Sequence, residues 1–176
     1  GSLARYYVSV SYVDEGGMYK VDEGLKDYNT NANYRRWNYR LNVDMDITKS
    51  TLLKVGVAGS LDKKNEPGMA GNIWASAMRN NPISVPVMYS NGYVPAYGSE
   101  NDQLNPWVAA TQTGYQETWN NKLQANATLE QSLNFITKGL KFIGRYGFDT
   151  NNYQWINRKK FPEMWRAEQN RASDGS

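Results

Sequence analysis

The sequence predicts an all-β fold, an antiparallel meander of about five long strands with short helices in one long connection. Apolar and polar residues alternate over stretches of ten to nearly twenty residues, which is the pattern of strands whose two faces meet different surroundings. Turn-forming clusters separate these stretches, so consecutive strands are expected to pair as hairpins. The predicted strands lie near residues 4–13, 34–47, 52–64, 115–133 and 140–150, and the long loop spans 65–114.

The clearest alternation lies in the hairpin of residues 34–64. Its first strand has apolar residues at the odd positions from Trp37 to Ile47 and polar residues at the even positions from Arg36 to Asp46. The second strand resumes the pattern after a turn that contains a Thr-Lys pair. We therefore expect one face of this hairpin to meet an apolar phase and the other to meet water.

The remaining strands show the same two faces. The first strand places Tyr6, Val8, Val10 and Tyr12 together, and the fourth and fifth repeat the pattern after residues 115 and 140. A second short turn, at residues 134–139, again contains a Thr-Lys pair. From Asn151 onward the sequence is polar with scattered aromatic residues, and we expect a loop there.

The connection of residues 65–114 differs from the strands in its residue pattern. A helix near residues 70–80 would place Ile73, Ala77 and Met78 on one side. Asn105 is the expected cap of a second short helix, with Pro106 at its first position and Gly114 as its terminator. Loops of this length inside an ordered domain are uncommon and tend to be functional.

Composition bounds the chemistry of this 176-residue chain. It contains no Cys and no His, so thiolate and imidazole ligands, and the commonest general base, are absent from the sequence. Asp44 and Asp46 lack the Gly and Glu of a calcium loop. We predict no metal, no cofactor, no catalytic residue and no enzymatic activity. The net charge of +3 is too small to predict nucleic-acid binding.

Two classes of β protein fit this pattern, a transmembrane barrel and a soluble or surface-attached β-rich module that binds glycans. Strands of ten or more residues exceed the typical 5 to 6 of soluble domains and favour the barrel. Large aromatic residues gather toward the long-loop ends of the apolar faces, as at a membrane interface: Trp37, Tyr39, Trp119, Tyr146 and Phe148. Short turns at one end and long loops at the other are also typical of outer-membrane barrels.

Several segments together resemble a known family. They are RYYVSVSYVDEGGMYK, the hairpin with its DITK turn and NEPG exit, the Asn-Pro helix start at Asn105, and the FITKGL turn. In order and spacing they resemble the early barrel strands of SusC/RagA-type TonB-dependent transporters of Bacteroidetes outer membranes. The resemblance covers nearly the whole chain, but it includes no catalytic signature and no plug domain.

The resemblance implies a function and partners. Such transporters are barrels of about 22 strands with a plugged lumen. As a family they take up glycan or peptide nutrients through the bacterial outer membrane together with a SusD-like surface lipoprotein, and they are energised by TonB through the plug. We therefore expect this chain to be a section of such a barrel that begins just after the plug, in contact with outer-membrane lipid, with residues 65–114 as an extracellular loop.

Two sets of side chains are candidates for contact with a ligand or partner. The lumen-facing candidates share the polar face of residues 34–47 and are Arg36, Asn38, Arg40, Asn42 and Asp44. The candidates in the long loop are aromatic and are Trp74, Tyr89, Tyr93, Tyr97 and Trp107. The alternative for the first set is pairing with one another across strands. The alternative for the second is packing of the loop on itself.

Overall fold

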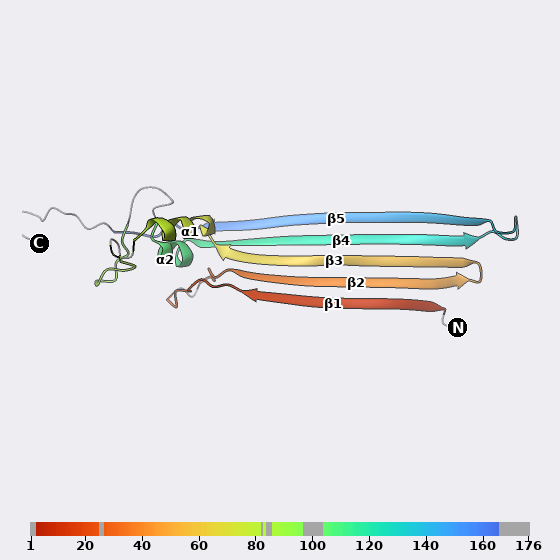
Figure 1. Cartoon of the computed structure of the whole chain (residues 1–176), viewed down its shortest axis with the longest axis horizontal. Coiled ribbons are helices and arrows are strands. Elements are labelled where there is room, and N and C mark those ends of the chain that lie inside the picture. Colours follow the sequence, from red (N-terminus) through yellow and green to blue (C-terminus); the bar gives the residue numbers. More distant parts are fainter. Residues whose placement is uncertain (1–2, 25–26, 82, 84–85, 97–103, 166–176) are drawn as a thin grey trace, which may run out of the picture. The chain divides into compact units, whose positions relative to one another are not determined.

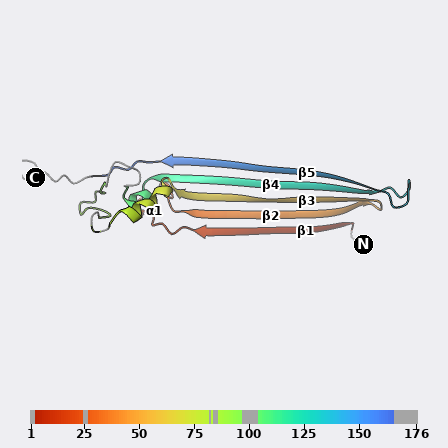
Figure 2. The same ribbon diagram turned by 45° about the horizontal axis from the view of Figure 1, so that its top comes forward.

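The computed structural model describes residues 3–24, 27–81, 83, 86–96 and 104–165. Five strands form one sheet in which each strand lies beside its neighbours in the chain (Figures 1 and 2). They are β1 (Ala4–Gly16), β2 (Asn33–Thr48), β3 (Thr51–Pro67), β4 (Gly114–Ser132) and β5 (Lys141–Lys159). The predicted all-β antiparallel meander of five long strands is therefore confirmed.

The strand order is linear, so β1 and β5 form the two edges of the sheet. The sheet formed by the described residues is not closed, and the barrel stays a prediction. The short turns β2–β3 and β4–β5 lie at the same end of the sheet (Figure 1). In the second turn Gly139 adopts a φ of 86°, and its amide donates to the Asn134 side chain at 2.9 Å.

The fifth strand is longer than predicted. We expected it to end near residue 150 and a loop to begin at Asn151, but β5 continues to Lys159. The predicted end was wrong because it was placed where the alternation of apolar side chains stops. A strand is held by backbone hydrogen bonds to its neighbour, which can continue beyond that point. β4 and β5 are both 19 residues long, and the Lys160 amide still donates to the Thr113 carbonyl at 2.9 Å.

The chain divides into two compact units. Unit 1 comprises Gly1–Glu15, Tyr34–Lys64 and Thr118–Gln154, and unit 2 comprises Gly16–Asn33, Asn65–Glu117 and Trp155–Ser176. The described part of unit 1 consists of strands and their short turns. Unit 2 contains both helices, α1 (Ala70–Arg79) and α2 (Pro106–Thr111). The helices thus lie in the long connection where the sequence predicts them.

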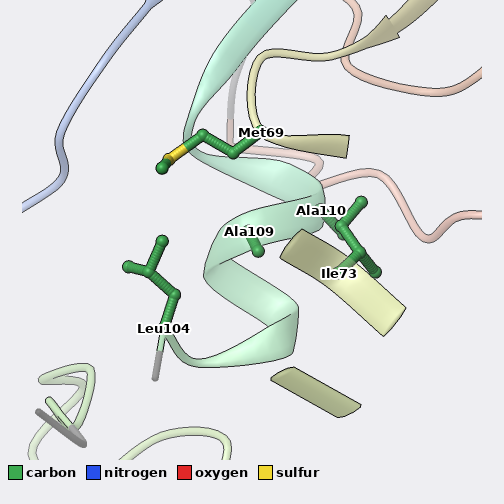
Figure 3. Packing of buried hydrophobic residues seen from close by; sticks show 5 residues of the cluster. All are labelled: Met69, Ile73, Leu104, Ala109 and Ala110. Atoms are coloured by element: carbon green, nitrogen blue, oxygen red, sulfur yellow. The ribbon is translucent and has the colours of Figure 1, made fainter. Parts of the chain in front are cut away.

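Unit 2 has a small apolar core that α1 and α2 share. Figure 3 shows its buried side chains, which are Met69, Ile73, Leu104, Ala109 and Ala110. On α1 the predicted inner face was partly wrong, since Ile73 is 6% exposed but Met78 is 84% exposed and Ala77 is exposed as well. The buried positions are 69, 73 and 76, which lie four and three residues apart and so share one helical face.

The second helix begins as predicted and ends earlier. The Asn105 side chain accepts from the Trp107 amide at 3.0 Å, and Pro106 occupies the first turn. The helix ends at Thr111, three residues before Gly114. Gly114 has a φ of 86°, and a Cβ there would collide with the Arg158 carbonyl oxygen, so only glycine fits where β4 begins.

Candidate functional site

Side-chain contacts across neighbouring strands define two faces of unit 1. On one face the rings of Tyr12 and Trp37 lie 5.3 Å apart. On the other the Asn38 amide donates to the Ser11 hydroxyl at 3.1 Å. Successive residues of β2 thus contact β1 on opposite sides, as the alternation of the strand requires. We call the side of Asn38 the polar face and the side of Trp37 the apolar face.

The polar face contains a hollow with a volume of about 700 Å³. Its middle is formed by β3, where the small residues Ala58, Gly59 and Ser60 line it. Residues of the neighbouring strands line the hollow on either side of these positions. The residues on the β1 and β2 side are Tyr7, Ser9, Arg36, Asn38, Tyr39 and Arg40. Those on the β4 and β5 side are Lys122, Gln124, Asp149, Thr150 and Asn151.

Arg36 is held in place at one side of the hollow. Its Nε lies 3.3 Å from the Asp62 carboxylate and 2.8 Å from the Asn38 side-chain oxygen. The Tyr34 hydroxyl donates to the same carboxylate at 3.1 Å. The charge of Arg36 is therefore largely compensated by Asp62, which lies outside the lining of the hollow.

Arg40 and Lys122 are the remaining cations of the hollow. Within the described part of the chain neither has a carboxylate within 4.0 Å, whereas Arg35, Arg36 and Lys54 each have one and Arg5 has two. Asp149, on β5, is the only carboxylate among the lining residues. The hollow therefore carries an excess of positive charge.

Three of the five candidates on the polar face come together in the hollow. Arg36, Asn38 and Arg40 line it, whereas Asn42 and Asp44 do not. Asp44 lies nearer the turns and faces Arg5, with an oxygen-to-nitrogen distance of 4.0 Å. Asp46 lies 3.5 Å from the same guanidinium. This part of the face is a cross-strand charge cluster of the ordinary structural kind.

The loop candidates do not form one site. Tyr93 stacks on Trp165 at 4.7 Å, and Trp165 also pairs with Val94 and Ala96 through its backbone. Trp74 is exposed on α1, while Tyr89 and Trp107 are half-buried. Tyr97 lies outside the described residues. No ring contact joins any two of the four described candidates, and Tyr93 packs on Trp165 of the segment after β5 rather than on another residue of the loop.

Sequence reasoning did not single out the far side of the hollow. Lys122, Gln124, Asp149 and Asn151 lie on two strands distant in the sequence from Arg40. The alternation placed Lys122, Gln124 and Asp149 on polar faces and left Asn151 in the expected loop. Only the pairing of the strands brings all four opposite β2 and β3. Trp165 was missed because it lies in the segment that we expected to be a loop.

Other chemistries find little support in the described residues. They contain no group of three or more His, Cys, Asp or Glu side chains that is arranged to hold a metal ion. None of the helices in the described ranges is long and apolar enough to cross a membrane.

Comparison with known proteins leaves the chain without an assigned family. No family model matches it, and no curated protein matches it significantly.

Proposed function

We propose that this chain forms part of the barrel wall of a TonB-dependent importer of the SusC/RagA type in the bacterial outer membrane. In this proposal it carries glycan or peptide nutrients together with a SusD-like lipoprotein, catalyses no reaction, and depends on TonB acting through a plug region. The observation that carries the proposal is the exposed apolar face of unit 1. The resemblance of the strand and turn segments supports the choice of family.

The apolar face is most exposed on the edge strands, is exposed at Tyr39, Leu41 and Ile47 on β2, and is half-buried on β3. Tyr6 and Val10 on β1 are 79% and 74% exposed, and Tyr146 on β5 is 70% exposed. Contiguous apolar surface of this kind is rare on soluble monomers and marks contact with another apolar phase. A lipid bilayer supplies such a phase along the whole length of every strand. A soluble glycan-binding module would have to leave this face in water.

The length of the apolar stretch suits a bilayer. On β2 it runs from Trp37 to Ile47, which is about 33 Å along the strand at roughly 3.3 Å per residue. Tilting the strand by about 40° reduces this to about 25 Å, close to the height of the apolar band on outer-membrane barrels. The strand is therefore long enough to cross the hydrocarbon layer.

Aromatic and charged residues mark one boundary of this stretch. Tyr12 pairs with Trp37, and in the following positions Asp14 and Arg35 form an ion pair at 3.4 Å. The Lys63 ammonium lies over the Trp119 ring, 4.4 Å from its centre. Aromatic rings followed by charged groups are expected where a strand leaves the lipid for the headgroup region. This arrangement favours a membrane boundary at these positions.

Quenching of tryptophan fluorescence by brominated lipid tests the proposal. The protein is folded into lipid vesicles with Trp37 as its single tryptophan. We expect quenching by lipids brominated near the headgroups. The matched control carries its single tryptophan through Asn38→Trp, at nearly the same depth on the polar face of the same strand, and should be quenched much less. A chain that stays monodisperse in buffer without detergent and shows no quenching at Trp37 would overturn the proposal.

A further inference from the structure

We propose that the hollow on the polar face binds a carboxylate-bearing oligosaccharide, with Arg40 and Lys122 holding the carboxylate. This inference rests on the proposed function, because it names the class of nutrient. It rests on residues of the polar face only, so its test is separate from the test of the apolar face.

The size of the hollow suits a short oligosaccharide. Sites for small molecules typically measure about 300 to 1,000 Å³, and the hollow has about 700 Å³. Its depth comes from Ala58, Gly59 and Ser60 on the central strand, which leave space between the long side chains of β2 and β4. Any larger residue at position 58 would fill this space.

The charge of the hollow selects an anion. Arg36 is already paired with Asp62, whereas Arg40 and Lys122 have no carboxylate partner among the described residues. The two lie on β2 and β4, one on each side of the small residues of β3. A carboxylate seated above β3 would satisfy both cations through charge-assisted hydrogen bonds, the stronger kind.

The remaining lining groups suit hydroxyl groups better than a second charge. Amide side chains of Asn38, Gln124 and Asn151 each both donate and accept, and Ser9 and Ser60 add hydroxyls. Tyr7, which is 56% exposed, offers an apolar ring at the β1 side. Asp149 repels a second carboxylate on the β5 side. Together these groups favour a saccharide that presents one carboxylate toward β2 and hydroxyls toward β5.

Titration calorimetry with sialyllactose, a trisaccharide that carries one carboxylate, tests this inference on the full chain in detergent micelles. Arg40→Gln should weaken binding about ten-fold, since a hydrogen bond to a charged group contributes enough for a change of that order. Arg145→Gln is the matched control. It removes the same charge from the polar face of β5 outside the hollow and should change the affinity less than two-fold. Asp149→Asn should tighten binding.

Two further probes identify the ligand class. Maltotriose, which has no carboxylate, should bind more weakly and be insensitive to Arg40→Gln. Tri-alanine carries a carboxylate but no sugar hydroxyls and should also bind more weakly. Equal binding of either probe and of sialyllactose would overturn the assignment. Equal losses in Arg40→Gln and Arg145→Gln would also overturn it, and so would the absence of sialyllactose binding.

A fourth variant guards against misfolding. Ala58→Leu fills the middle of the hollow without altering charge and should abolish binding while the circular dichroism spectrum is kept. Unchanged binding in this variant would contradict the site. Lipid quenching at Trp37 is measured in parallel. If saccharide does not bind but Trp37 is quenched by lipid, the ligand assignment is refuted and the membrane proposal stands. If saccharide binds but Trp37 is not quenched, the membrane proposal is refuted and the ligand assignment stands.

Discussion

The two units of the chain place their apolar residues in opposite ways. Every buried hydrophobic side chain among the described residues lies in unit 2, around α1, α2 and the segments next to them. Unit 1 has the more regular apolar pattern, yet its apolar residues remain half-buried or exposed. Unit 2 therefore has an apolar core of its own, whereas the described residues leave the apolar face of unit 1 uncovered.

The largest effect is expected in the core of unit 2. Ile73→Ala should lower the free energy of unfolding by about 2–5 kcal/mol, because it opens a cavity between α1 and α2. Urea denaturation and hydrogen exchange of the α1 amides measure it. Met78→Ala on the exposed side of the same helix is the control and should cost less than about 0.5 kcal/mol. Equal costs would mean that the core of unit 2 does not support α1.

The next effect tests whether the two faces of unit 1 differ. Leu41→Arg puts a charge in the middle of the apolar face and should cost about 2–4 kcal/mol in lipid. Asn42→Arg makes a similar change on the polar face and should stay within about 0.5 kcal/mol. Urea-driven unfolding from vesicles measures both. If Leu41→Arg is as mild as Asn42→Arg, the apolar face does not meet lipid.

The contrast between the units explains what could be predicted from the sequence. The five strands were predictable because two surroundings impose a period of two that each strand displays by itself. The end of β5 was not, since residues 151–157 are mostly polar and are held by pairing with β4. The inner side of α1 depended on where Leu104 and α2 lie, so Ile73 was placed correctly and Met78 was not.

The hollow shows a similar division. Arg36, Asn38 and Arg40 were candidates because one strand displays them in alternate positions. The depth of the hollow arises from small residues of β3 beside long residues of β4, and Lys122 meets Ser60 only through strand pairing. The residue pattern within one strand does not specify the register in which it pairs with the next strand. When a site is spread over several strands, the sequence can therefore predict which residues of each strand share a face. It does not predict which residues of different strands come together.

A smaller effect is expected at two glycines of unit 1. A Cβ at Gly59 would contact the Tyr39 hydroxyl and come within 2.5 Å of the Lys122 carbonyl oxygen, so Gly59→Ala should cost about 1–3 kcal/mol. A Cβ added at Gly147 would have no non-neighbouring atom within 4 Å. Gly147→Ala should therefore stabilise the strand by about 0.5–1 kcal/mol. Urea midpoints measure both. If both variants change the free energy of unfolding in the same direction, the close approach of the Lys122 carbonyl oxygen at Gly59 does not constrain the sheet.

The smallest effect is expected at the ion pair of Lys54 and Glu130 on the polar face. The two side chains approach to 2.6 Å but remain 42% and 30% exposed, so water and salt weaken their attraction. A double-mutant cycle with Lys54→Gln and Glu130→Gln should give a coupling smaller than any of the preceding effects. The cycle is repeated at 1 M salt, where charges are screened over about 3 Å. Coupling that vanishes there agrees with a polar face open to water, whereas coupling that persists would mean that this face is covered and that both faces of unit 1 are shielded from solvent.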